Sequence, residues 1–284
     1  MTEPIMKKVR GDGVQIQVAI WEGEGKNIIC IHGITANCRS WDVVASAIAP
    51  SHKVIALDLR GRGGSDKPDT GYSLDHHLKD INCLMDDFGM EKAVLMGHSL
   101  GAFISLAFAA HYPERTDRIV LFDGGGKLSQ EQLDTIFEAI KPALDRLGKV
   151  FPSSDAYIAA MKSAPYIQPW SSAIEDYYRY ELEKVEGGVS CNIKPAHIEE
   201  EAANIRKVEV DKFYSKVQCG VLILRATVGI VSQADLLLPE PVIERMTKEI
   251  TTSRRVDITG SNHYAIVFQP NEVRDRALME FLED

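Results

Sequence analysis

The sequence predicts an α/β fold in which a mostly parallel central sheet carries helices on both faces. Short runs of apolar, often β-branched residues bounded by Gly and Asp alternate with longer amphipathic segments along the chain. Such alternation is typical of parallel strands joined by crossover helices. The apolar runs are continuous, as expected for strands that are buried on both faces.

The strands and helices are assigned in chain order from these two patterns. Residues 14–20 alternate like a half-buried strand, and the remaining strands are buried runs. The predicted strands are Val14–Ile20, Asn27–Ile31, Lys53–Leu57, Ala93–Met96, Arg118–Phe122, Val221–Leu224 and Arg254–Ile258. The predicted helices are Trp41–Ile48, Leu74–Phe88, Leu100–His111, Pro241–Glu249 and Asn271–Leu282.

The alternation stops between Phe122 and Val221. This interval has a mostly helical pattern, many aromatic residues and no buried strand-like run, and several prolines divide it into short helices. We interpret residues 125–214 as a helical insertion over a discontinuous core formed by residues 1–124 and 215–284. The alternative is a plain extension that packs elsewhere.

The composition is that of an acidic globular protein. Of the 284 residues, 45% are hydrophobic and 26% are charged, which excludes disordered, collagen-like and coiled-coil classes. The net charge of −9, without a block of Lys and Arg, argues against nucleic-acid or anionic-membrane partners. No stretch approaches the ~18 consecutive apolar residues of a spanning helix, and the first ten residues lack a secretory apolar core. We therefore expect a cytoplasmic protein.

The cysteines indicate neither a disulfide framework nor a metal site. They are scattered, odd in number and contain no CxxC pair, so we expect all of them to be structural and no metal to be bound. They are Cys30, Cys38, Cys83, Cys191 and Cys219.

The motif Gly97-His98-Ser99-Leu100-Gly101 predicts a nucleophile. It follows a predicted strand and precedes a helix rich in small residues, which is the context that a G-x-S-x-G elbow requires. The glycines accommodate a strained serine backbone that side chains two residues away would obstruct. Ser99 then stands at a helix N-terminus, where partial positive charge stabilises a developing oxyanion.

A second loop, Ile31-His32-Gly33-Ile34-Thr35, follows an earlier strand. A tetrahedral intermediate needs two backbone N–H donors ~3 Å from its oxygen. We expect one from Leu100, directly after the nucleophile, and the other from Ile34. His32 is expected to hydrogen-bond its own loop.

A third element, His263, lies behind the last predicted strand and before the terminal helix. It stands far downstream of Ser99 at the carboxyl end of a strand, where it can act as general base if it reaches the serine.

These motifs in this order resemble the α/β-hydrolase superfamily along nearly the whole chain. Further shared strings are Asp58-Leu59-Arg60-Gly61-Arg62-Gly63-Gly64-Ser65, Tyr112-Pro113-Glu114-Arg115 and Asn262-His263. The resemblance is to the branch of capped serine esterases, lactonases and carbon–carbon-bond hydrolases, which implies a helical cap between strands 6 and 7. It also implies Ser99 as nucleophile, His263 as base, the Ile34 and Leu100 N–H groups as oxyanion hole, and no cofactor.

The sequence departs from that family at the third member of the triad. The usual acid position after the seventh strand holds Gly229, or Val228 in the neighbouring register. Two replacements keep the chain order Ser, Asp, His. We favour Asp123, which ends a predicted strand, over the alternative acid Asp235 in the loop beyond Val221–Leu224.

The function expected from these residues is acyl-transfer hydrolysis of a small to medium, fairly apolar ester, a carboxylesterase activity. Trp170 and Met161 of the insertion are candidates for shaping the substrate pocket. Hydrolysis of a carbon–carbon bond or a lactone would use the same triad, and the former needs a cationic anchor, for which Arg179 and Arg206 are candidates. A non-catalytic small-molecule receptor or scaffold is the alternative from another class. The oligomeric state is left open.

Overall fold

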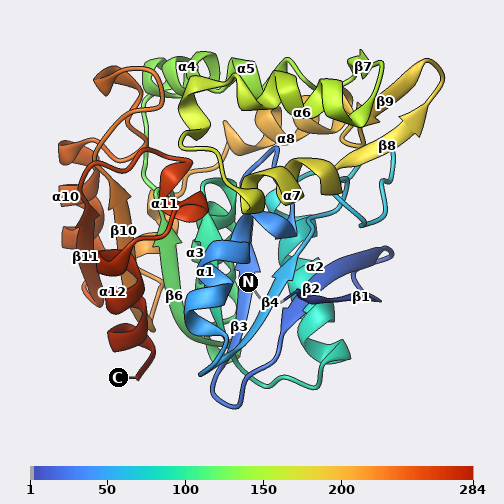
Figure 1. The fold of residues 1–284 in the computed structure, drawn as a ribbon. Helices are drawn as coiled ribbons and strands as arrows, with labels where there is room; N and C mark the ends of the chain where they lie inside the picture. Colours follow the sequence, from blue (N-terminus) through green and yellow to red (C-terminus); the bar gives the residue numbers. More distant parts are fainter. Residues whose placement is uncertain (1–2, 284) are drawn as a thin grey trace.

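The structure is a computed structural model that describes residues 3–283. Its centre is an eight-stranded sheet in the order β1-β2-β4-β3-β5-β6-β10-β11 (Figure 1). The pairs β1–β2 and β2–β4 are antiparallel and all the other pairs are parallel. The strands are β1 (Ile5–Arg10), β2 (Gln15–Trp21), β3 (Asn27–Ile31), β4 (Lys53–Leu57), β5 (Ala93–His98), β6 (Thr116–Phe122), β10 (Gly220–Ala226) and β11 (Ser253–Ile258).

The predicted mostly parallel sheet is confirmed, and one strand was missed. All the strands predicted from the sequence lie where expected, with small differences at their ends. The missed strand is β1, in which every residue except Val9 is exposed and three of the six are Lys or Arg. It joins the edge of the sheet through backbone pairing with β2 rather than through an apolar run.

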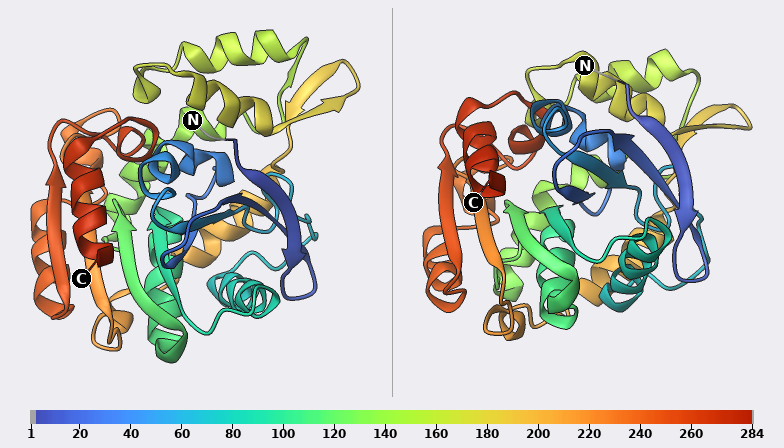
Figure 2. Two further views of the ribbon diagram at one scale, coloured as in Figure 1. Left: turned by 60° about the horizontal axis from the view of Figure 1, so that its bottom comes forward. Right: turned by 90° about the horizontal axis from the view of Figure 1, so that it is seen from below.

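Helices cover both faces of the sheet (Figure 2). Alternate residues of β3 show why its apolar run is continuous. Ile28 and Cys30 belong to the core on the side of α1 and α12, whereas Ile29 and Ile31 belong to the core on the side of α2, α3 and α10. The helices are α1 (Asp42–Ile48), α2 (Leu74–Asp87), α3 (Leu100–His111), α10 (Glu240–Glu249), α11 (Ala265–Phe268) and α12 (Glu272–Glu283).

Most of the chain between β6 and β10 lies over the carboxyl ends of the parallel strands (Figure 1), whereas its last part returns along α3, where Phe213 meets His111. Because loops that leave parallel strands meet at this edge, the inserted segment faces the loops that follow β3, β5, β6 and β11. Its elements are α4 (Gln130–Ala139), α5 (Lys141–Leu144), β7 (Val150–Phe151), α6 (Ser154–Lys162), α7 (Ser172–Tyr180), β8 (Leu182–Val185), β9 (Gly188–Cys191), α8 (Pro195–Ile205) and α9 (Asp211–Tyr214).

The insertion is mostly helical, as expected, but it also contains strands that were not predicted. A three-stranded antiparallel sheet, β7-β9-β8, lies within it. Its strands are short and partly exposed, so they produce no buried apolar run. The local signal is the dipeptide Glu186-Gly187 between alternating residues, which forms a two-residue hairpin connection with Gly187 at φ 86°.

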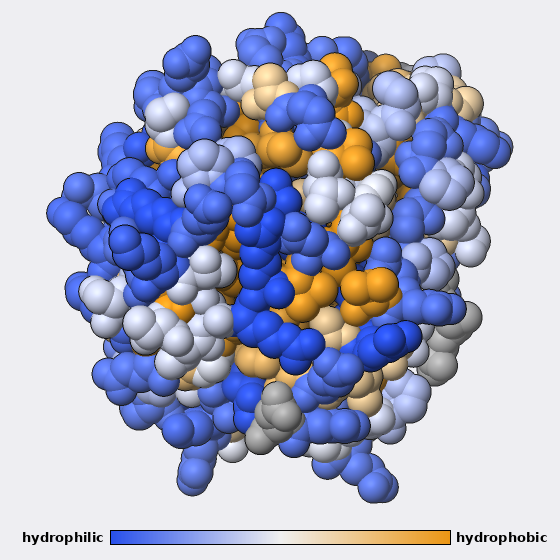
Figure 3. All heavy atoms as spheres, turned by 90° about the vertical axis from the view of Figure 1, so that its left-hand side faces the viewer, coloured by the Kyte–Doolittle hydropathy of each residue, from blue (hydrophilic) through white to orange (hydrophobic). Residues whose placement is uncertain are grey.

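Seen from the side of α10, β11 and α12, the surface is mostly hydrophilic, with apolar side chains showing in its upper and central parts (Figure 3). Among residues 3–283, no helix is both long and apolar enough to cross a membrane.

Candidate active site

Ser99 stands on a strained turn between β5 and α3. Its backbone has φ 54° and ψ −116°, a combination that non-glycine residues rarely adopt. The turn needs glycine on both sides. A Cβ at Gly97 would lie 2.0 Å from the carbonyl oxygen of Gly101, and one at Gly101 would lie 2.0 Å from that of Ile31. The close approach of strand and helix therefore explains both glycines of the motif.

The structure brings His263 and Asp123 together beside this turn. Nδ1 of His263 lies 2.9 Å from Oδ2 of Asp123, and both side chains are buried. Asp123 directly follows β6 with φ 46°, and its other carboxylate oxygen accepts a hydrogen bond from the Ala226 N–H at 3.1 Å. Both oxygens are thus engaged, and the contact orients the imidazole through its Nδ1.

The alternative acid, Asp235, lies elsewhere. Its buried carboxylate accepts hydrogen bonds from the backbone N–H groups of Ile230, Val231 and Ser232, at 2.5, 3.0 and 2.8 Å. Within the part of the chain that the structure describes, no hydrogen bond joins Asp235 to His263. Asp235 therefore closes its own loop after β10.

The contact between His98 and His263 was not predicted from the sequence. His98 Nε2 lies 2.9 Å from the carbonyl oxygen of His263, and the two ring centroids are 4.4 Å apart. Burial, and next the neighbouring His263, hold the pKa of His98 well below its usual value, so the ring is neutral and its Nε2–H donates to that carbonyl. The only sequence signal was its place inside the elbow motif.

The two proposed oxyanion donors border Ser99. Leu100 is the first residue of α3, so its N–H has no acceptor within the helix. Ile34 lies in a turn closed by a hydrogen bond from the Ala36 N–H to the Gly33 carbonyl, at 3.1 Å. Ile34 and Ser99 line the same cavities.

The expectation for His32 is confirmed. Its Nδ1–H donates to the Gly33 carbonyl at 2.7 Å, and its Nε2 accepts from the Leu59 N–H at 3.0 Å. Burial lowers the pKa of His32 to about 3, which keeps the ring neutral in these roles.

Two cavities meet at Ser99. The first, which we call the base lobe, has a volume of about 40 Å³ and is lined by residues that include His263, Tyr264, Tyr177 and Thr35. The second, which we call the apolar lobe, has a volume of about 70 Å³. Its lining includes Leu100, Phe103, Leu133, Phe137 and Leu237.

Size alone does not identify the site. A groove of about 510 Å³ lies beside β1, β2 and α1, but none of the described residues that line it is a histidine. No group of three or more His, Cys, Asp or Glu side chains among residues 3–283 is arranged to hold a metal ion.

Trp170 and Met161 are not brought to Ser99. Neither is among the described residues that line the two lobes. Trp170 stacks on Tyr178 with ring centroids 5.7 Å apart, and Met161 is buried in the same apolar cluster. These side chains pack in the apolar cluster that the insertion shares with the core on the side of α1 and α12.

Comparison with known proteins shows which family and which relatives this chain is similar to. The family described as alpha/beta hydrolase fold matches residues 26–156. A 2-(acetamidomethylene)succinate hydrolase from Mesorhizobium japonicum is 28% identical over 262 residues, covering 92% of this chain and 90% of that protein.

Solved structures agree over the full length. The crystal structure of E-2-(acetamidomethylene)succinate hydrolase has a TM-score of 0.87 at 26% identity, covering 99% of this chain and 100% of that one. An enol-lactonase from Burkholderia xenovorans shares the fold, with a TM-score of 0.73 at 17% identity and coverage of 98% and 100%. The chain therefore has the α/β-hydrolase fold, and its residues 26–156 match the family of that description.

Proposed function

We propose that this protein is a serine carboxylesterase that acts through an acyl-enzyme on small to medium, fairly apolar esters. The observation that carries the proposal is the strained Ser99 beside a buried His263 that Asp123 contacts through Nδ1 at 2.9 Å. In this proposal Ser99 is the nucleophile, His263 is the general base, and Asp123 is the acid that orients the His263 imidazole. Residues 125–214 act as a lid over this site.

The reaction proceeds in two halves. Ser99 Oγ attacks the ester carbonyl carbon while His263 Nε2 takes its proton, and the N–H groups of Ile34 and Leu100 stabilise the oxyanion. The carbon–oxygen bond then breaks, and His263 returns the proton to the departing alcohol. Water attacks the acyl-enzyme by the same route, which releases the acid and restores Ser99.

We assign the alcohol part and the acyl part of the ester to different lobes. Because His263 must protonate the alcohol oxygen, the alcohol occupies the base lobe that His263 lines. The acyl group then occupies the apolar lobe, next to Leu100 and Phe103. That lobe is small and lined almost wholly by apolar side chains, which favours short, neutral acyl groups.

Filling the apolar lobe should shorten the accepted acyl chain. Leu133 lines this lobe from α4, so Leu133→Trp is expected to lower kcat/KM for p-nitrophenyl butanoate about tenfold or more and to spare p-nitrophenyl acetate. Val150→Trp is the control, because Val150 is 54% exposed on the insertion and lines neither lobe. Equal losses for both esters would contradict the assignment of the acyl group to this lobe.

A second candidate comes from the Mesorhizobium relative, whose substrate is a succinate derivative. A carboxylate-bearing substrate, including the ring-fission product that a carbon–carbon-bond hydrolase cleaves, needs a cationic anchor. None of the described residues lining either lobe is Lys or Arg. Arg179 pairs with Glu175 and Asp155 and is 41% exposed, and Arg206 pairs with Asp134 at 2.7 Å. The neutral ester is therefore the better supported substrate.

A hydrolysis panel tests the proposed substrate class. Purified protein is assayed on p-nitrophenyl esters of two to eight carbons, on lactones and on dienol-diketone ring-fission products. We expect the highest kcat/KM for a short neutral ester. Turnover of the ring-fission product without activity on the esters would reject the carboxylesterase proposal in favour of carbon–carbon cleavage.

A further inference from the structure

Two buried arginines hold consecutive carbonyl groups of the loop that carries Ile34. Arg62 Nε donates to the Ile34 carbonyl oxygen at 3.1 Å, and Arg146 Nη2 donates to the Thr35 carbonyl oxygen at 2.7 Å. The side chains of both arginines are at most 1% exposed. Arg62 comes from the core loop after β4, and Arg146 comes from the insertion after α5. The loop is thus held from both sides.

Each arginine is itself fixed by a buried carboxylate of the insertion. Arg62 pairs with Glu201 of α8 at 3.0 Å, and His77 of α2 contacts the same carboxylate oxygen at 2.8 Å. Burial raises the pKa of Glu201, but the interactions of its carboxylate with His77 and Arg62 outweigh this effect and lower the pKa to about 2. The carboxylate is therefore charged when it holds Arg62.

The second pair is bidentate. Arg146 Nε and Nη2 donate to the two carboxylate oxygens of Glu181, both at 2.8 Å, and Tyr157 OH donates to the same carboxylate. Such a fork fixes the orientation of the guanidinium plane, so the Nη2 hydrogen that remains is aimed at the Thr35 carbonyl. Removing the two charges of this pair from water costs free energy. What the pair provides here is a fixed position for the Arg146 guanidinium.

The peptide groups that these arginines hold adjoin the proposed oxyanion donor. The carbonyls of Ile34 and Thr35 belong to the two peptide planes that follow the Ile34 N–H, and this turn has no helix or strand to fix it. An oxyanion hole works only if its N–H groups already point at the developing charge. Small rotations of these planes would misalign the Ile34 N–H.

We propose that Arg146 is a positioning residue through which the insertion aligns the Ile34 N–H, so that the oxyanion hole is complete only when the insertion is seated on the core. This inference rests on the proposed function, since it concerns the same Ser99 site. Arg62 supports the loop from the core side, and Glu201 ties that support to α8 as well.

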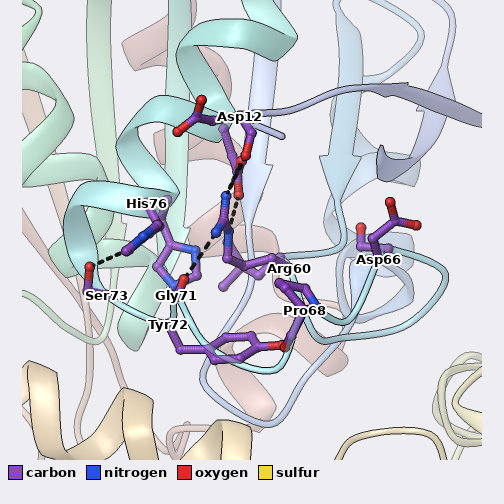
Figure 4. Close-up of polar contacts among 12 residues, drawn as sticks. Asp12, Arg60, Asp66, Pro68, Gly71, Tyr72, Ser73 and His76 are labelled. Carbon is purple, nitrogen blue, oxygen red and sulfur yellow. Dashed lines mark hydrogen bonds and ion pairs between the residues drawn. The ribbon is translucent and has the colours of Figure 1, made fainter. Parts of the chain in front are cut away.

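The test compares two double variants that each remove a buried arginine–carboxylate pair. Arg146→Met/Glu181→Gln removes the donor to Thr35 without leaving a buried unpaired charge. Arg60→Met/Asp80→Asn is the matched control. Arg60 is also buried, pairs with Asp80 at 2.7 Å, and its side chain donates to the carbonyls of Gly71 and Asp12 (Figure 4). The Ile34 and Thr35 carbonyls accept from Arg62 and Arg146 instead.

We expect the Arg146 double variant to lose about 10- to 100-fold in kcat on a p-nitrophenyl ester, with KM within about threefold of the parent. Its affinity for a trifluoromethyl ketone, which forms an oxyanion on Ser99, should fall by a similar factor. Affinity for the matching methyl ketone should not change. The Arg60 double variant should lower the melting temperature and keep kcat within about twofold.

The other possible results of these assays would contradict the inference or the proposed function. Unchanged kcat in the folded Arg146 double variant, or equal kcat losses in both double variants, would overturn it. If the Arg146 double variant does not fold, Arg146→Lys replaces it, because lysine keeps the charge opposite Glu181 but cannot supply the fork and the Thr35 contact together. A kcat equal to the parent in Arg146→Lys would likewise overturn the inference. Hydrolysis that persists in Ser99→Ala would instead reject the proposed function.

Discussion

Ser99→Ala is expected to abolish ester hydrolysis and covalent labelling by a fluorophosphonate probe, while the protein stays folded. The expected loss of kcat is about 10⁴-fold or more, because the covalent intermediate can no longer form. The backbone at Ser99 has φ 54°, and alanine is strained there in much the same way as serine. The melting temperature should therefore change by only a few degrees. Hydrolysis of p-nitrophenyl acetate, gel fluorescence of the labelled protein and thermal unfolding measure the three quantities.

Ser105→Ala supplies the matched control. Ser105 is a buried serine of the same helix α3, but its hydroxyl donates to the Gly101 carbonyl at 2.8 Å and takes no part in the proposed reaction. Labelling and hydrolysis should persist in this variant. A parent protein that is never labelled would favour the non-catalytic receptor, and labelling of Ser99→Ala would show that another residue is the nucleophile.

The sequence was informative wherever the determinant is local. The buried runs that became β3, β4 and β5 needed only a few neighbouring residues to be recognised. The elbow at Ser99 was equally local, because strand, glycines and helix follow one another without interruption. The edge strand β1 and the hairpin β8–β9 were missed since their pairing depends on partners rather than on an apolar run.

Contacts between distant segments could not be read in this way. The His98 ring reaches the His263 carbonyl across 165 positions, and Arg146 reaches the Thr35 carbonyl across 111. Composition identifies neither contact, because an arginine or a histidine in a helix or loop has no local signature for the group it will meet. The aromatic residues of the insertion illustrate the same limit, since the sequence offered Trp170 as a candidate for the pocket but did not identify Tyr178 as the ring on which it stacks.

Besides the dipeptide Glu186-Gly187, a second local signal was available and not used. The spacing Ser232-x-x-Asp235 is that of a capping box, and the structure shows Asp235 accepting from the Ser232 N–H while Ser232 caps the short helix that ends at Asp235. That spacing assigns Asp235 to its own loop. Asp123 carries no such partner three residues away, and its carboxylate meets His263, 140 positions along the chain.

Asp123→Asn is expected to lower kcat on activated esters by about 10⁴-fold, with little change in the melting temperature. The carboxylate that faces His263 Nδ1 at 2.9 Å would be replaced by an amide, which neither stabilises the imidazolium nor fixes the tautomer with Nε2 unprotonated. The backbone at Asp123 has φ 46°, which asparagine tolerates as well as aspartate, and the amide oxygen can still accept from the Ala226 N–H.

Asp235→Asn should give the opposite pair of results. An amide has one acceptor oxygen, so at least one of the three loop N–H groups that Asp235 now satisfies would lose its partner in a buried place. The expected cost is about 1–3 kcal/mol of unfolding free energy, measured by denaturant titration, with kcat within about twofold of the parent. The two variants therefore separate catalysis from stability. An active Asp123→Asn beside an inactive but folded Asp235→Asn would reverse the assignment of the acid.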